Sequence, residues 1–360
     1  MATAPETIAA PVLRVGRSDG VRGAAIRLAI VGFVALGAAL VLGVGLGSVG
    51  VAPGDTLGIL AHRMFGVDVV QTWPASAETI VVDLRLSRVL TSMLVGMGLA
   101  VAGVTFQGLL RNPLADPYVL GTASGAALGA AIAVLLPVNL VVLQFGLLHG
   151  LAFIGALLAI TAVYKLARLG GSAPMTSLLL TGYAVGSLLA AGLALAMYLS
   201  GTALRQIFDF LLGGFDGATW QRLAATLPFI VIGSALILLR ARSLNAMLLG
   251  EEAAAHLGID VRRERMILLG LGSLVTAAAV AISGLIGFIG LVVPHVVRLV
   301  VGPSARLVLP LSALGGAVLL AFADIAARMM GEIPVGVVTA VLGAPFFLVI
   351  LRRARSGYEG

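Results

Sequence analysis

The sequence predicts an all-α integral membrane protein with about ten transmembrane helices. Of the 360 residues, 60% are hydrophobic and only 11% are charged, and the mean hydropathy is +1.11. A soluble domain contains about 25% charged residues, because its surface must be solvated. Long apolar runs fill most of the chain, and arginines stand singly or in small groups between them. No stretch is polar enough to form a separate soluble domain.

Ten apolar runs are candidates for membrane spans, because a bilayer core of about 30 Å requires roughly 20 apolar helical residues. The first run is too long for a signal-peptide core and is therefore expected to be retained. These runs form one predicted transmembrane domain over 28–353, flanked by tails at 1–27 and 354–360. The runs cover about 28–49, 87–110, 117–136, 146–167, 175–199, 223–241, 264–282, 285–302, 308–330 and 334–351.

The distribution of basic residues predicts the orientation of these spans. With the N-terminus in the cytoplasm, 17 of the 23 Lys and Arg residues lie on the cytoplasmic side. The positive-inside rule favours this arrangement. An even number of spans then places both termini in the cytoplasm of a multi-pass protein of the cell (inner) membrane. The six basic residues expected outside are Arg63, Arg85, Arg88, Arg205, Arg222 and Arg328.

Composition also argues against several other functions. The net charge is +7, but the arginines form no basic face with interleaved aromatics, so nucleic-acid binding is not expected. The chain has no cysteine, which excludes disulfides, thiolate metal sites and cysteine nucleophiles. Its four histidines are far apart in the sequence, so we expect no metal site: His62, His149, His256 and His295.

The 47 glycines are expected at helix contacts, because small residues let transmembrane backbones approach closely. Two rows have the small-xxx-small spacing, Gly121-xxx-Gly125-xxx-Gly129 and Gly182-xxx-Gly186. A weak similarity between 101–121 and 280–302 predicts two five-helix halves. Because five is odd, these halves would form an inverted repeat, as in many transporters.

The sequence contains no evident energy source for transport. A P-loop needs a Gly-Lys-Ser/Thr element, and the single lysine, Lys165, lies between Tyr164 and Leu166. Asp324 is the only acidic residue inside a predicted span. It precedes Arg328 by four residues, so an ion pair on one helix face is favoured over a proton relay. A pump of this kind would need a separate ATPase; an ion-coupled secondary carrier and a passive channel are the alternatives.

A polar segment at 248–265 falls on the predicted cytoplasmic side. Glu251 and Glu252 open an alanine-rich helix, where acidic residues suit the positive end of the helix dipole. Gly258 is well placed to end that helix. The pattern fits a solvated connector and a coupling helix for a partner equally well.

Several motifs together resemble the FecCD-type permeases, which are the membrane subunits of ABC importers for iron chelates and vitamin B12. In the first half these are Arg85-Leu-Ser-Arg88, QGLLRNPLADP from Gln107 to Pro117, and Gly121. The resemblance covers about 28–353. The second-half motifs are Leu249-Gly-Glu251, AHLG from Ala255 to Gly258, SGLIGFIGLVVPH from Ser283 to His295, Arg298, Ala323-Asp324, and IPVGVVTAVLGAP from Ile333 to Pro345.

The resemblance implies a fold like that of the vitamin B12 permease, with two permease copies around a central pathway. It further implies two cytoplasmic ATPases that bind ATP-Mg and a substrate-binding protein outside. The chain itself would then be a transport subunit in the lipid bilayer, without enzymatic activity or a cofactor. The coupling residues expected from the motif are Leu249, Gly250, Glu251, Glu252, Ala255 and Gly258.

Arg85, Arg88 and Arg328 match the family's outer arginines, which meet acidic residues of the binding protein. Such arginines can also simply reach the membrane interface. The helices over 175–199 and 334–351 would line the pathway, with a gate near Met175, Thr176 and Ser177. The predicted substrate is an iron chelate (a ferric siderophore or haem), with cobalamin as the alternative.

Overall fold

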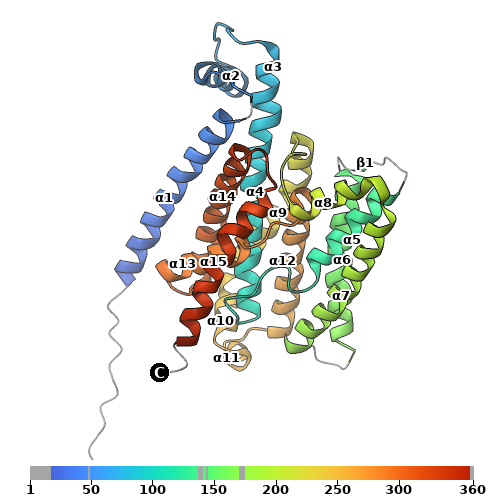
Figure 1. Ribbon diagram of the computed structural model, residues 1–360. Helices are drawn as coiled ribbons and strands as arrows, with labels where there is room; N and C mark the ends of the chain where they lie inside the picture. Colours follow the sequence, from blue (N-terminus) through green and yellow to red (C-terminus); the bar gives the residue numbers. More distant parts are fainter. Residues whose placement is uncertain (1–17, 48, 137–140, 143–144, 170–174, 357–360) are drawn as a thin grey trace, which may run out of the picture.

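The computed structural model describes residues 18–47, 49–136, 141–142, 145–169 and 175–356 of the chain. Within this part the protein is a bundle of helices, as predicted (Figure 1). One exception is a minimal antiparallel pair, in which β1 (Val141–Val142) pairs with β2 (Phe145–Gly146) between two helices.

Among the described residues, seven helices are long and apolar enough to span a membrane, and three shorter apolar helices accompany them. Each of the ten predicted runs coincides with one of these helices. The long helices are α1 (Ser18–Gly45), α4 (Ser87–Leu109), α6 (Leu147–Ala167), α7 (Met175–Leu199), α9 (Trp220–Leu239), α12 (Val261–Ser283) and α14 (Ala305–Met329). The shorter ones are α5 (Thr122–Leu135), α13 (Ile289–Val301) and α15 (Val335–Ser356), of which Val335–Val349 is the apolar part.

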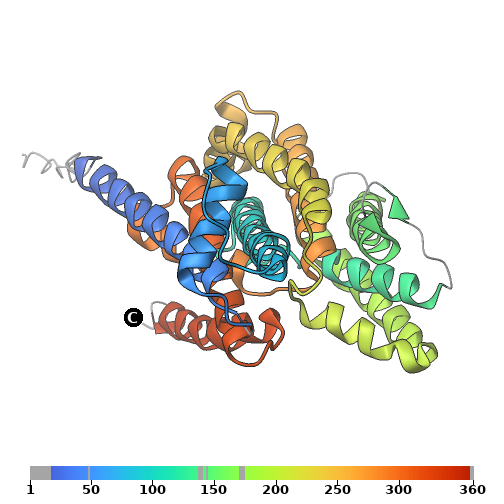
Figure 2. The same ribbon diagram turned by 90° about the horizontal axis from the view of Figure 1, so that it is seen from above.

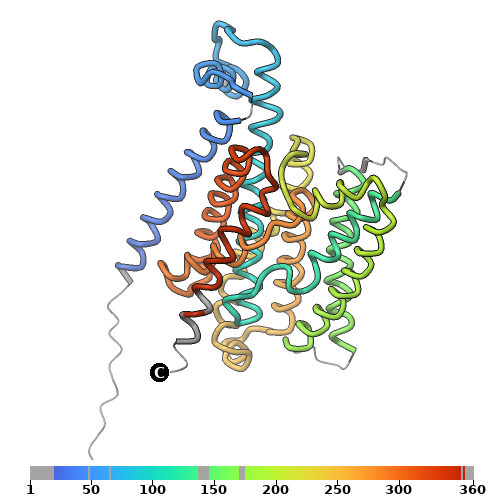
Figure 3. The backbone as a smooth tube through the Cα atoms, in the orientation of Figure 1, coloured from blue at the N-terminus to red at the C-terminus, as the bar shows by residue number. Residues whose placement is uncertain are grey.

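The remaining helices lie at the two ends of the bundle (Figures 1 and 3). One end holds α2 (Pro53–Phe65), α3 (Ala75–Glu78), the 3-10 turn η2 (Gly201–Ala203) and α8 (Leu204–Leu212). The other holds α10 (Ala241–Leu248) and α11 (Glu251–His256), together with the start of α1 and the end of α15. We call these the outer and inner ends, after the predicted orientation.

Two helices are longer than the sequence predicts. α1 begins at Ser18, so the described part of the predicted tail, residues 18–27, is helical; residues 1–17 and 357–360 lie outside the described part. α4 continues a helix that starts at Ala75 and includes the π-helical turn η1 (Thr79–Leu86). The outer extension is helical because Val81 packs with Ile59 and Trp73 in a small apolar cluster outside the main bundle.

α5 and α13 are short because irregular backbone precedes each of them. Their 14 and 13 residues rise only about 20 Å, less than the bilayer core. Irregular backbone at that depth requires polar partners inside the protein. Tyr118 supplies them on one side, as its hydroxyl donates to Ile286 O at 3.0 Å and accepts from Ile286 N at 3.3 Å. Gln107 Nε2 donates to Gly290 O at 3.1 Å.

α4 occupies the centre of the bundle and is its most deeply buried span (Figure 2). A methyl group at Gly96 would overlap the carbonyl of Gly316 on α14, so these two backbones are in direct contact. The predicted role of the glycine rows is confirmed, because Gly125 and Gly129 lie directly against the backbone of α6. The rigid core therefore surrounds α4, whereas α7 and α15 lie at its edge.

Candidate functional site

Charged side chains from three separate parts of the chain meet at the outer end of the bundle. All of them except the fully buried Asp324 line a pocket of about 240 Å³. We refer to this group as the outer charge cluster: Arg85 and Arg88 from η1 and α4, Asp216 from the loop between α8 and α9, Asp324 and Arg328 from α14, and Glu332 just beyond α14. The three arginines predicted for docking thus line one pocket.

Arg85 is almost fully buried and caps the C-terminal end of α1. Its Nη1 donates to the carbonyls of Val44 at 3.0 Å and Gly45 at 3.1 Å, and its Nη2 donates to that of Val49. The last carbonyls of a helix have no partner within the helix and carry its negative dipole end, which a guanidinium satisfies well. Only 5% of Arg85 is exposed. Its position in the structure is therefore that of a helix cap.

Asp324 is fully buried between two arginines. Its Oδ1 accepts from Arg88 Nε at 2.9 Å, and its Oδ2 lies 3.3 Å from Arg328 Nε. The predicted Asp324–Arg328 ion pair is confirmed. Arg328 Nη1 also donates to Leu46 O at 3.2 Å, whereas its buried Nη2 has no acceptor within the described residues.

Asp216, the second carboxylate that binds Arg88, was not identified from the sequence. Its Oδ1 accepts from Arg88 Nη1 at 2.6 Å, and 72% of its side chain is exposed. No spacing rule could detect this contact, because the two residues are 128 positions apart. Arg88 is therefore held between a buried carboxylate and an exposed one.

The three arginines are all largely buried and differ mainly in their partners; the side chain of Arg88 is 13% exposed and that of Arg328 is 6% exposed. Arg85 and Arg328 are at least nine-tenths buried, and both bind carbonyls at the end of α1. Arg88 has a partner at the protein surface. Their docking role stays a prediction.

The predicted coupling helix exists at the inner end as α11. Gly258 lies just beyond it and has a φ of +79°. The backbone N–H of Gly258 donates to Ala255 O at 2.9 Å, and that of Ile259 donates to Ala254 O at 3.1 Å. This left-handed glycine motif is a common helix terminator, so the predicted end at Gly258 is confirmed. Exposed apolar side chains flank this helix, because Leu249 before it and Leu257 directly after it are 71% and 65% exposed.

The two glutamates of α11 differ in their environment. Glu251 forms an ion pair with Arg265 in the first turns of α12, and the adjacent Glu264 pairs with Arg240 at the end of α9. Glu252 is exposed. α11 is thus braced against α12, the helix that continues into the buried core. The coupling role of α11 itself stays a prediction.

The predicted gate residues form the first turn of α7 at the inner end. Met175 packs against the main core, Thr176 is exposed, and Ser177 donates to Ala167 O at 3.5 Å. Farther along α7, Tyr183 and Tyr198 are more than three-quarters exposed. Neither the gate nor the pathway role is tested by this geometry.

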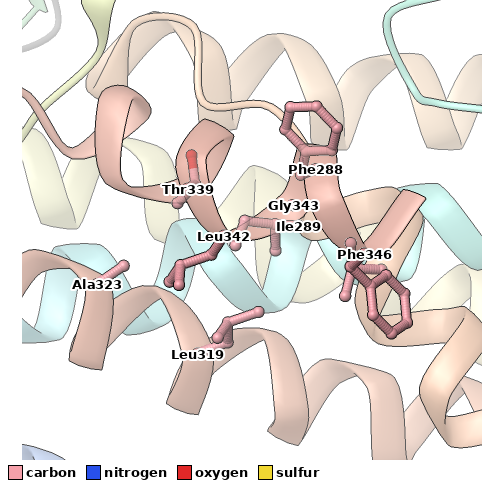
Figure 4. Close-up of a pocket in the computed structure, with 9 residues that line it drawn as sticks. Phe288, Ile289, Leu319, Ala323, Thr339, Leu342, Gly343 and Phe346 are labelled. Carbon is pink, nitrogen blue, oxygen red and sulfur yellow. The ribbon is translucent and has the colours of Figure 1, made fainter. Parts of the chain in front are cut away.

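α15, the second predicted pathway helix, packs incompletely against its neighbours. An apolar pocket of about 110 Å³ lies between it and helices α13 and α14 (Figure 4). The ring of Phe288 fits against α15 only because residue 343 is glycine; a methyl group there would overlap the ring. α15 also has an exposed face that includes Val341 and Leu342.

A further polar contact inside the bundle joins two of its helices. Arg298 on α13 donates to Oε1 of Gln107 on α4. Both residues lie in the motifs quoted above, but their pairing was not predicted. The four histidines lie on four different helices, and no group of three His, Asp or Glu residues within the described ranges is placed to bind a metal ion.

Comparisons with known proteins agree with this architecture. The family model described as the FecCD transport family matches residues 35–353. A cobalamin import system permease protein of Halobacterium salinarum is 46% identical over 83% of this chain and 79% of its own length. A hemin transport system permease protein of Yersinia pestis is 43% identical over 77% and 84%.

A solved structure, assigned to a metal-chelate type ABC transporter in an inward-facing conformation, has the same fold. It has a TM-score of 0.75 and 28% identity, covering 93% of this chain and 99% of that chain. The match to the family model extends from α1 to α15 and includes both the outer charge cluster and α11. The chain therefore belongs to the FecCD transport family.

Proposed function

We propose that this chain is the permease subunit of an ATP-binding-cassette importer that moves an iron chelate, a ferric siderophore or haem, into the cytoplasm. The observation that carries this proposal is the unbroken family match over residues 35–353. The chain forms the route through the membrane, and separate ATPase subunits bind ATP-Mg and hydrolyse it. Both termini face the cytoplasm in this arrangement.

The inner end supports binding of the ATPase. Leu249 and Leu257 are largely exposed beside Glu252 and Ala255, on a helix with a defined end at Gly258. Large exposed apolar side chains with a polar rim are typical of a protein interface. α11 would insert into the ATPase, and the Glu251–Arg265 pair would transmit its movement to α12.

At the outer end, we propose that Arg88 meets an acidic residue of the substrate-binding protein. Arg88 has a partner at the surface, whereas Arg85 and Arg328 bind carbonyls at the end of α1. These two buried arginines would hold the docking surface in place. Complementary charge of this kind accelerates association and selects the partner.

A second copy of the chain would complete the pathway. The exposed apolar residues of α7 and α15 support this, since they would face the other copy and the substrate. Charged residues are rare on these faces, so the substrate would be bound weakly and released readily. Met175, Thr176 and Ser177 would form the inner gate.

Reconstitution into liposomes tests the proposal. The chain, its ATPase and its binding protein should together take up a labelled ferric siderophore or haem only when ATP is present on the ATPase side. An ATPase variant that binds ATP without hydrolysing it is the control. Uptake driven by a proton or sodium gradient, without any ATPase, would contradict the proposal and indicate a secondary carrier.

Cobalamin is the second candidate substrate, because a relative with 46% identity carries a cobalamin permease name. Competition within the same liposomes distinguishes the two substrates. Excess unlabelled cobalamin should leave the uptake of the iron chelate unchanged. Saturable, ATP-driven uptake of labelled cobalamin that an iron chelate does not inhibit would assign the chain to cobalamin instead.

A further inference from the structure

The loop from Gly213 to Thr219 connects the outer charge cluster with α15. Gly213 O accepts from Gly336 N at 3.3 Å, in the first turn of α15. The next residue, Gly214, donates to Ser283 O at 2.8 Å, where α12 ends. Phe215 is 2% exposed and anchors the loop in the main core. A movement of this loop would therefore reach α15 directly.

The contact with α15 is made by the backbone and leaves little clearance. A methyl group at Gly336 would overlap the carbonyl of Leu212, the residue before the loop. Along the membrane part of α15, by contrast, the apolar pocket beside Phe288 and Leu342 shows looser packing (Figure 4). The start of α15 is thus tied to the loop, and its middle has room to shift.

Asp216 fastens the outer edge of this loop to Arg88 through an ion pair that is open to solvent on its carboxylate side, whereas the Arg88 side chain is 13% exposed. Its carboxylate is 72% exposed, whereas Asp324, the other carboxylate on Arg88, is fully buried. Solvent-exposed ion pairs contribute little to stability, because water competes for both partners. The Asp324 contact keeps Arg88 in place if Asp216 leaves.

We propose that Asp216 is a positioning residue that a carboxylate of the substrate-binding protein replaces on Arg88. The incoming carboxylate pairs with a guanidinium that is already fixed by Asp324, and docking excludes water from the new pair. Asp216 is displaced and the outer edge of the loop loses its attachment to Arg88, while Phe215 keeps the loop anchored in the core. The resulting shift of the loop reaches the start of α15 through the Gly213–Gly336 hydrogen bond. The proposal rests on the proposed function and adds to it how docking is sensed by a pathway helix.

The test is Asp216→Asn, which keeps the shape of the side chain and removes its charge. In the complete transporter, docking of the binding protein should become at least three-fold tighter, because the internal competitor is lost. ATP hydrolysis without the binding protein should increase by a similar factor, because the loop is already detached from Arg88. Asp209→Asn is the matched control: this exposed acid on α8 forms no ion pair within the described part of the chain.

A double-variant cycle locates the effect on Arg88. The gain from Asp216→Asn should vanish when Arg88 is alanine. Unchanged or weaker docking of the Asp216→Asn variant would overturn the exchange, and unchanged basal hydrolysis would overturn the link to α15. If the Arg88→Ala variant still binds the substrate-binding protein normally, both the exchange and the docking assignment are overturned. ATP-driven uptake into liposomes, measured separately, reports on the transport function.

Discussion

The two ends of this protein differ in the side chains that they expose to a partner. At the outer end, charged residues are gathered into a cluster in which buried Asp324 neutralises two arginines and Arg85 caps a helix. At the inner end, α11 exposes Leu249 and Leu257. The outer end is arranged to hold a fixed pattern of charge for a partner that arrives and leaves. The inner end has the apolar character of a lasting interface.

The largest effect is expected at Asp324. Asp324→Asn leaves Arg88 and Arg328 without their shared buried carboxylate, and breaking a buried ion pair costs about 3–5 kcal/mol. Denaturant unfolding of the detergent-solubilised protein measures this loss. The exposed Asp209→Asn is the control and should change stability by less than about 0.5 kcal/mol. A loss below about 1 kcal/mol at Asp324 would show that the cluster does not stabilise the outer end.

Next in size is the helix cap at Arg85. Arg85→Met removes the charged donor from three carbonyls at the end of α1, and hydrogen bonds to charged groups contribute about 1.5–3 kcal/mol. Arg63→Met is the matched control, because Arg63 is 59% exposed and its pair with Glu78 is solvated. Equal stabilities of the two variants would contradict the capping role.

At the inner end the expected effect is on association and not on stability. Leu257→Asp places a charge on the exposed edge of α11, so binding of the ATPase should weaken at least ten-fold, equivalent to about 1.4 kcal/mol. Co-purification with the ATPase and unfolding in detergent are the two measurements. The variant should unfold like the wild type, because Leu257 is exposed. If Leu257→Asp lowered the stability of the protein but left ATPase binding normal, residue 257 would act in folding and not in association, contrary to this account.

The smallest effect on stability is expected for the two glutamates of α11, which we expect to differ in how their substitution affects transport and ATPase binding. Glu251→Arg should cost less than about 1 kcal/mol in stability and reduce transport, because it places two cations together at a partly exposed site. The exchanged pair, Glu251→Arg with Arg265→Glu, should restore transport. Glu252→Arg should reduce ATPase binding, and Arg265→Glu should not restore it. Rescue of both variants by Arg265→Glu would mean that the brace is not specific to Glu251.

Local features were predictable from the sequence, and contacts distant along the chain were not. Apolar runs of bilayer length identified the spans, Gly258 marked the end of α11, and the i,i+4 spacing predicted the Asp324–Arg328 pair. The partner of Arg88 on a loop 128 residues away was not predictable, since no periodicity connects the two. Arg85 was assigned to docking from the family resemblance, and that role stays a prediction. Its contact with the end of α1 was not predictable, because its acceptors are backbone carbonyls, which every residue carries and no pattern can indicate. The inverted repeat of two five-helix halves stays a prediction.

Single cysteines in this cysteine-free chain test the central claim, that α11 at the inner end binds the ATPase, most directly. Leu257, directly after α11, and Leu57 on α2 are both 65% exposed, at opposite ends of the bundle. The measurement is the rate at which a polar maleimide labels Leu257→Cys and Leu57→Cys in detergent, with and without the ATPase. The ATPase should slow labelling at position 257 at least ten-fold and leave position 57 unchanged. Equal rates at position 257 with and without the ATPase, or protection at position 57 instead, would contradict the account.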